Sequence, residues 1–144
     1  MIVLDASVLI AHFEETDPFH EQATALLSSA ADQALAASAI TVAEVLVGPA
    51  RAGQLDRAVG VLGQLEVRTI PLSEATPPQL AALRAETGLK LPDCCVLVAT
   101  SLAQGTALAS FDNRLRSAAR HRGLKVLPEK EHHAAAPARR TLAQ

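Results

Sequence analysis

The stretch MIVLDASVLI, residues 1–10, decides the fold of this chain. Its first four residues form an apolar run that is typical of a short buried strand, and Asp5 ends that run. Residues 6–14 then have the pattern of a helix that follows the strand at once. A strand passing directly into a helix is typical of an α/β protein, so we expect further strand and helix pairs downstream.

The remaining sequence repeats this alternation, because glycine, proline and capping residues divide it into short segments. Further strands are predicted at residues 35–37, 67–72, 106–110 and 124–127. Further helices are predicted at residues 18–29 behind Asp17 as N-cap, from Ser38 or Thr41 to 48–49, at 54–65, from Ser73 to Gly88, at 94–103 and at 113–121. The alternation predicts a three-layer α/β/α sandwich with a mostly parallel central sheet.

The chain length of 144 residues is enough for one domain with a proper core. We expect that domain at residues 1–128 and a polar tail without apolar periodicity at 129–144. Residues 1–112 carry 5 basic and 13 acidic side chains, whereas residues 113–144 carry 8 basic and 2 acidic ones. Nucleic acid would favour the basic part; a solvated basic helix and tail would give the same pattern.

The sequence shows no membrane segment or secretion signal. Its first ten residues contain Asp5 and no basic residue, and Gln104-Gly105 divides the uncharged run of residues 94–111 into a helix and a strand. We therefore expect a soluble, cytoplasmic protein. The adjacent Cys94 and Cys95 are interpreted as small buried helix residues, and no histidines have metal-ligand spacing.

Acidic residues occupy four contexts that are unusual for surface carboxylates. Asp5 ends the run MIVL, Glu44 lies inside TVAEVLVG, Asp93 precedes CCVLVATSLAQG, and Asp112 follows TALASF. Acids rarely occur in such apolar surroundings unless they are paired or bound to a metal. For single residues an alternative remains, since Asp5, Asp93 or Asp112 could each be a helix N-cap.

The predicted architecture brings these acids together. In a parallel sheet, ligands gather outside the carboxyl ends of the strands, and Asp5 and Asp112 both follow predicted strands. Asp93 at a helix start and Glu44 on a connecting helix could approach the same edge. Like charges at short range raise each other's pKa, and Mg²⁺ or Mn²⁺, which prefer oxygen ligands, would relieve the repulsion. The acids therefore predict a divalent-metal site.

Four segments carry a resemblance to a known family: MIVLDASVLI at residues 1–10, ITVAEVLVG at 40–48, LKLPDCCVLVATSLAQG at 89–105 and ALASFDNRL at 107–115. In this order and spacing they resemble the PIN domain over residues 1–127, and the short chain is most similar to VapC-type toxins of bacterial toxin–antitoxin pairs. The resemblance implies a magnesium-dependent endoribonuclease that hydrolyses RNA phosphodiesters. Its DNR segment departs mildly from commoner endings, which leaves the roles of Asn113 and Arg114 open.

The resemblance also implies roles for individual residues. Asp5 and Asp93 would be the principal metal ligands, and Glu44 and Asp112 would complete the acidic pocket, with one or two metal ions. Hydroxyl groups that support the pocket and are candidates for substrate binding come from Ser7 and Ser110.

Basic residues follow Asp112 along the next predicted helix. Arg114 and Arg116, together with Arg120 and Arg122, are expected to contact the RNA backbone near the site. The alternative for these arginines is a solvated helix face.

Partners are implied by the same resemblance. A cognate VapB-type antitoxin would wrap the toxin with its C-terminal segment and could insert an arginine into the acidic pocket. A homodimer could use the apolar faces of the early helices around Phe13, Phe19, Leu26 and Leu27.

Other functions stay open. The same pocket would suit a DNA nuclease or an RNA-processing PIN nuclease without an antitoxin, and the fold could also serve as a non-catalytic nucleic-acid-binding module. A phosphoacceptor receiver domain would need paired acids after the first strand. A haloacid-dehalogenase-like phosphatase would need a second aspartate at the position of Ser7.

Overall fold

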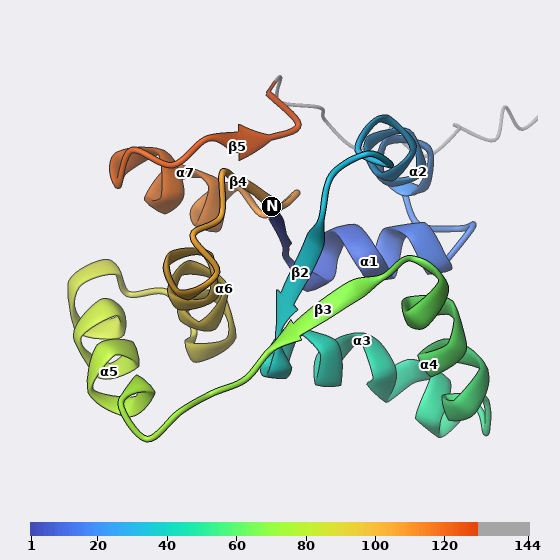
Figure 1. Ribbon diagram of the computed structural model, residues 1–144, viewed down its shortest axis with the longest axis horizontal. Coiled ribbons are helices and arrows are strands. Elements are labelled where there is room, and N and C mark those ends of the chain that lie inside the picture. Colours follow the sequence, from blue (N-terminus) through green and yellow to red (C-terminus); the bar gives the residue numbers. More distant parts are fainter. Residues whose placement is uncertain (130–144) are drawn as a thin grey trace, which may run out of the picture.

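The computed structural model describes residues 1–129 and shows an α/β protein with a parallel sheet (Figure 1). The strands are β1 (Ile2–Leu4), β2 (Leu35–Ser38), β3 (Val67–Ile70), β4 (Ala107–Ala109) and β5 (Val126–Leu127). They lie in the order β3-β2-β1-β4-β5, and every pair of neighbours is parallel. The prediction of a mostly parallel sheet is confirmed, and no described strand runs antiparallel.

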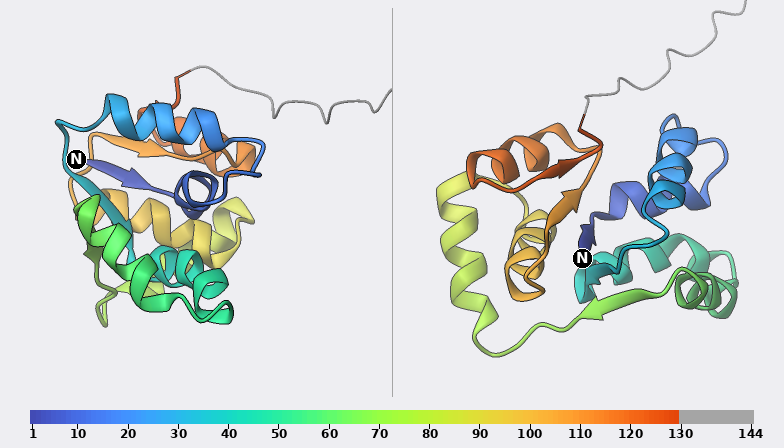
Figure 2. Two further views of the ribbon diagram at one scale, coloured as in Figure 1. Left: turned by 90° about the vertical axis from the view of Figure 1, so that its right-hand side faces the viewer. Right: turned by 45° about the horizontal axis from the view of Figure 1, so that its top comes forward.

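Helices cover both faces of this sheet. They are α1 (Ala6–Phe13), α2 (His20–Ser29), α3 (Ala39–Arg51), α4 (Leu55–Gln64), α5 (Thr76–Thr87), α6 (Leu91–Leu102) and α7 (Asn113–His121). One core cluster joins side chains of α1 to α4 to one face of the strands, and a second cluster joins α5 to α7 to the other face. Figure 2 shows the two helical layers from further sides. The predicted three-layer sandwich is therefore confirmed.

Alternation along β1 explains how one short strand serves both cores. Ile2 and Leu4 point into the first cluster, whereas Val3 points into the second, and all three are at most 1% exposed. A strand buried on both faces reads as a continuous apolar run, as MIVL does. On its far side β1 pairs with β4, where Leu4 lies opposite Ala109.

Helix α6 explains the long uncharged run in the sequence. Every residue from Cys94 to Thr100 is buried, because this helix packs between the sheet and α5. Cys94 and Cys95 are buried free thiols, as interpreted from the sequence. Among the described helices, none combines the length and the apolar character that a membrane span requires.

Several predicted helix boundaries were wrong: α6 begins at Leu91 rather than at residue 94, and the residue at the N-cap position of α5 is Ala75 rather than Ser73. Helix α3 passes through Gly48 and Pro49 and ends at Arg51. Proline costs one helical hydrogen bond in such a position, but the Pro49 carbonyl accepts from the Gln54 amide at 2.8 Å, which continues the helix into its closing turn. Helix α2 begins at His20, because the Asp17 carboxylate caps a separate turn by accepting from the Phe19 amide at 2.8 Å.

The residues around which a homodimer was predicted pack mainly against the first core cluster. Leu26 and Leu27 are 8% and 6% exposed in the first core cluster, and the half-buried Phe13 and Phe19 pack against that cluster. A homodimer on the early helices stays a prediction.

The central strands should dominate stability. Leu108 on β4 is fully buried between its neighbours β1 and β5. We expect Leu108→Ala to lower the free energy of unfolding by roughly 2–5 kcal/mol, because it removes buried methyl groups and leaves a cavity. Chemical denaturation measures the change. The matched control is Val59→Ala on α4, where the side chain is 50% exposed and we expect a change within about 0.5 kcal/mol; equal losses would contradict this assignment of the core.

Candidate active site

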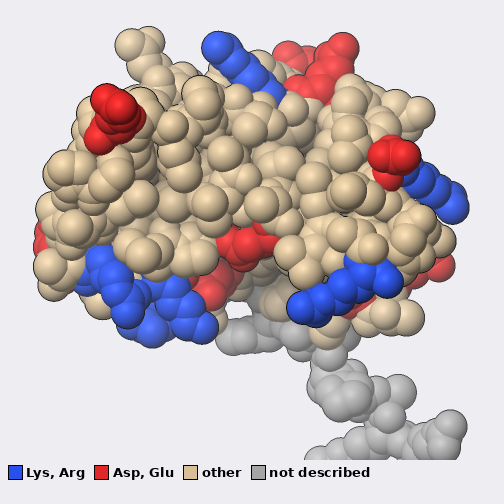
Figure 3. All heavy atoms as spheres, turned by 90° about the horizontal axis from the view of Figure 1, so that it is seen from below, with Lys and Arg blue, Asp and Glu red and all other residues tan. Residues whose placement is uncertain are grey.

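The acidic site lies where β1 and β4 end. Asp5 follows β1 directly, and its backbone amide donates to the Ala109 carbonyl at the end of β4 at 2.9 Å. Ser110 and Asp112 continue from β4 on the same edge of the sheet. Figure 3 views the molecule from below, with acidic side chains near the middle of this face and basic side chains on either side.

Two serine hydroxyls hold the Asp5 carboxylate. Ser7 and Ser110 each donate to Oδ2 of Asp5 at 2.8 Å. Each hydroxyl also accepts a backbone amide at 3.0 Å, from Phe111 in the case of Ser7 and from Asp112 in the case of Ser110. In these bonds the serine protons point at Asp5, while the serine oxygens accept the two amides. This network therefore suits the ionised, acceptor form of the carboxylate.

Burial opposes that ionisation. Asp5 is 7% exposed, and burial is the main cause that raises its pKa above the ordinary value. The hydroxyls of Ser7 and Ser110 lower the pKa in part, whereas the negative charge of Asp112 raises it further. The side chain is thus a rigid carboxylate with unfavourable surroundings for its charge, which a bound cation would improve.

Asp93 joins the site from the first turn of α6. The residue at the N-cap position of this helix is Lys90, so Asp93 is not the cap. The pKa of Asp93 is raised to about 6, first by burial and then by the negative charges of Asp5, Asp112 and Glu44, while the positive charge of Lys90 lowers it. The charges of all three other acids therefore reach Asp93, so the four lie in one region of the fold.

Glu44 reaches the site from α3. Its side chain is more exposed than Asp5, and its pKa is raised by partial burial and then by the charge of Asp5. On the same helix, the apolar side chains of Ile40 and Val47 are 36% and 44% exposed, so Glu44 stands among partly exposed apolar residues.

Asp112 does cap a helix. Its Oδ1 accepts from the Leu115 amide at 3.0 Å at the start of α7. Asp5 also occupies an N-cap position but makes no capping hydrogen bond with its side chain. The alternative interpretation as an N-cap thus holds for Asp112 and not for Asp5 or Asp93. Asp112 still contributes negative charge to both of these aspartates.

The predicted arginines have different positions. Arg116 is 3% exposed and donates to the carbonyls of Ser110, Leu127 and Pro128 at 2.9, 3.2 and 2.7 Å. It ties α7 to the ends of β4 and β5, which leaves almost none of it for a nucleic acid. Arg114 is exposed and donates to the Gly88 carbonyl at 3.4 Å.

A stacked aromatic pair lies beside the site, which the sequence analysis did not identify. The rings of Phe19 and Phe111 are 4.6 Å apart and 9° from parallel. Phe111 stands between Ser110 and Asp112, so this contact packs the site loop against the residue before α2. The available sequence signal was the rarity of aromatic residues, since two of the three phenylalanines in the chain make this pair.

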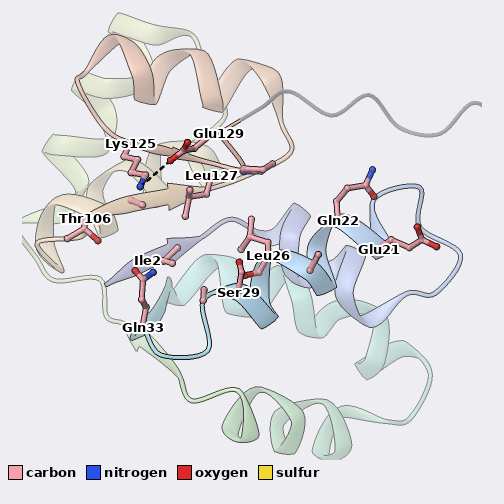
Figure 4. Close-up of a pocket in the computed structure, with 14 residues that line it drawn as sticks. Ile2, Glu21, Gln22, Leu26, Ser29, Gln33, Thr106, Lys125, Leu127 and Glu129 are labelled. Atoms are coloured by element: carbon pink, nitrogen blue, oxygen red, sulfur yellow. Dashed lines mark hydrogen bonds and ion pairs between the residues drawn. The ribbon is translucent and has the colours of Figure 1, made fainter.

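A separate cavity of about 820 Å³ lies between α2 and the β4–β5 edge of the sheet (Figure 4). Leu26 and Ser29 line one wall, and Thr106, Lys125 and Leu127 line the other. None of the four acids of the site lines it. Its charged residues include Lys125 and Glu129, which form an ion pair at 3.2 Å.

Comparison with known proteins identifies the class. Residues 2–121 match the model of the PIN domain, so this chain belongs to the PIN domain family. No curated protein gives a significant match. A toxin–antitoxin complex from Klebsiella pneumoniae contains a chain with 26% identity and a TM-score of 0.70, covering 92% of this chain and 100% of that one.

Two further solved structures share the fold. VapC20 of Mycobacterium tuberculosis, described as a Sarcin-Ricin loop cleaving toxin, has 17% identity and a TM-score of 0.70, covering 82% of this chain and 95% of that one. VapBC2 of Rickettsia felis, bound to a promoter DNA fragment, has 16% identity and a TM-score of 0.62, covering 88% and 97%.

The raised pKa of Asp93 predicts how stability changes with pH. Since its folded-state pKa is about 6 against an ordinary 3.8, the folded protein binds more protons between these values. The free energy of unfolding of the metal-free protein should therefore fall as pH rises from 4 to 6. We expect Asp93→Asn to reduce that fall, as measured by urea denaturation in EDTA at pH 5 and 7.5.

The matched control for this measurement is Asp32→Asn, at an exposed acid that precedes β2. It should keep the pH dependence of the unmodified protein. If Asp93→Asn also keeps the pH dependence of the unmodified protein, then the raised pKa is not that of Asp93.

Proposed function

We propose that this protein is a metal-dependent endoribonuclease and the toxin of a type II toxin–antitoxin pair, acting in the cytoplasm. The observation that carries the proposal is that Asp5 and Asp112 follow the neighbouring parallel strands β1 and β4 at their carboxyl ends. The charges of Asp5, Asp112 and Glu44 all reach Asp93 on α6. That edge is where parallel sheets bind ligands. Membership in the PIN family and the likeness to a toxin–antitoxin complex support this function.

The donor set fits a hard divalent cation. All four groups offer carboxylate oxygens, which Mg²⁺ prefers and Mn²⁺ accepts. Asp5 and Asp93 would be the principal ligands, with Glu44 and Asp112 completing the pocket. Within residues 1–129, no three His, Cys, Asp or Glu side chains are already arranged as a ligand set.

The proposed chemistry is hydrolysis of an RNA phosphodiester, which would leave a 5′-phosphate and a 3′-hydroxyl. A bound divalent ion supplies charge for the phosphoryl oxygens and lowers the pKa of a water molecule. The protein's own part is to fix the ligands. Ser7 and Ser110 orient Asp5 and favour its ionised form, while the α6 backbone sets the position of Asp93.

The proposed partner is a VapB-type antitoxin. The Klebsiella pneumoniae structure is a toxin–antitoxin complex, and the chain of it that matches aligns over its whole length with this one. An arginine of the partner placed among the four acids would supply the positive charge that the site lacks, and its planar donors match carboxylates. Such a contact would block the metal site and so restrain the nuclease.

Cleavage of RNA tests the function directly. We expect antitoxin-free protein to cut total cellular RNA into discrete fragments with Mg²⁺ or Mn²⁺, and not with EDTA. Asp93→Asn should reduce the rate by at least about 100-fold, because it removes a principal ligand. Gel analysis and mapping of fragment ends give the readout. Asp32→Asn is the control and should cleave normally.

Other outcomes of that assay select other functions. Cleavage of DNA with intact RNA would favour a DNA nuclease, and a processing cut in one precursor RNA would favour a nuclease without an antitoxin. Intact RNA and DNA in every lane, with folded and metal-bound protein, would contradict the nuclease and leave a binding module.

Metal binding can be tested without activity. We expect Mg²⁺ to raise the melting temperature of the unmodified protein at pH 7.5, because the ion binds the folded state and relieves the repulsion. The increase should be much smaller for Asp5→Asn, which halves the principal ligand pair, and unchanged for Asp32→Asn. An equal increase in all three proteins would place the metal elsewhere.

A further inference from the structure

A basic cleft lies between the C-terminal end of α5 and the length of α7. It has a volume of about 560 Å³, and Thr87, Leu89, Asn113, Arg114, His121 and Arg122 are among the residues that line it. Figure 2 shows the end of α5 beside α7 on the side of the molecule away from α3 and α4. The cleft contains no aromatic residue except His121.

The cleft begins at the boundary of the acidic site. Asn113 directly follows Asp112, and Leu89 lies four residues before Asp93. The chain segments that place these two acids therefore also form the near end of the cleft. Helix α7 then leads away from the site for nine residues, a length of about 13 Å.

The charges in the cleft favour a polyanion. Arg114 and Arg122 contribute positive charge, and Glu86 is the only acid among the lining residues. Glu86 pairs with Arg122, with Nη1 and Oε1 at 3.2 Å, but its side chain is 62% exposed. An exposed pair of this kind contributes little to stability and exchanges readily. The 3.4 Å contact of Arg114 with the Gly88 carbonyl is also at the long limit of a hydrogen bond.

We propose that the RNA strand held at the acidic site continues along this cleft, with backbone phosphates bound by Arg114 and Arg122. The proposal rests on the ribonuclease function proposed above. Four carboxylates repel a phosphate backbone, so a substrate needs cations beyond the metal to stay bound. Arginine offers planar donors that match phosphate. Without stacking aromatic rings, these contacts read the backbone and carry no base sequence.

The arginines of the α7 segment then have different roles. Arg116 is buried on backbone carbonyls at the strand ends and has a structural role. Arg114 and Arg122 face the cleft with exposed or partly exposed guanidinium groups. Glu86 then acts against the substrate, because it occupies Arg122 and adds a negative charge.

The experiment measures binding of a fluorescent single-stranded RNA by anisotropy, in the Asp93→Asn background so that the RNA stays intact. We expect Arg114→Ala with Arg122→Ala to weaken binding roughly 20-fold at 0.1 M salt and to reduce the slope of log affinity against log salt by about 1.4, since two phosphate contacts are lost. In the active protein the same pair should raise KM and leave kcat nearly unchanged.

Glu86→Ala supplies a test of opposite sign. It breaks the same ion pair with Arg122, so a structural role would give losses like those of Arg122→Ala. The proposal instead expects tighter RNA binding by several-fold. Arg68→Ala, at an exposed arginine on β3 outside the cleft, is the charge-matched control and should match the background protein.

The possible outcomes distinguish failure of the cleft proposal from failure of the proposed ribonuclease function. If the unmodified protein cleaves RNA but the cleft variants bind RNA as Arg68→Ala does, the cleft is not the substrate path. Weaker RNA binding for Glu86→Ala would also overturn the proposal. The same anisotropy measurement with a fluorescent acidic peptide supplies another outcome: if the Arg114 and Arg122 variant binds RNA normally and loses affinity only for the peptide, the proposal is overturned. If the unmodified, folded protein neither binds nor cleaves RNA, the proposed ribonuclease function fails, and the inference with it.

Discussion

The buried carboxylate of Asp5 is the constraint on which the site depends. It stands between the ends of two central strands, where its two serine partners and nearby backbone compensate in part for the loss of water. Because each serine oxygen is itself fixed by a backbone amide, the carboxylate has one orientation. The register that places Leu4 opposite Ala109 sets this geometry, since it brings Ser110 beside Asp5. The pairing of β1 with β4 therefore fixes the geometry of the site.

The site gathers charge that destabilises the fold which holds it. Burial and neighbouring acids both raise the pKa of Asp93, so the ionised protein is under electrostatic strain at neutral pH. Strain of this kind is typical of functional sites, where a ligand of opposite charge relieves it. The well-packed strands around Leu4 and Leu108, both fully buried, provide the stability that tolerates it.

Much of this fold could be predicted from the sequence, because its signals are local. The apolar run before Asp5 and the uncharged run after Asp93 each mark a buried element, and both were assigned correctly. The role of Arg116 could not be predicted. Its carbonyl partners lie at the ends of two strands, and only the folded sheet brings them to α7. The passage of α3 through Pro49 was missed for another reason: proline usually marks a helix end, whereas here its carbonyl accepts from the Gln54 amide in the closing turn.

The division of charge along the chain acquires a structural meaning in the folded protein. Residues up to Asp112 supply all four acids of the site, and the next residues begin the basic segment. Because α7 starts at Asn113, the change of sign occurs at the edge of the site itself. The electrostatic field changes sign over one helix. In the proposed function a metal ion would lie at the acids and a polyanion would lie beside them, along the basic segment. An isolated cation or an isolated anion would satisfy half of this surface, whereas a metal-bound phosphate chain satisfies both.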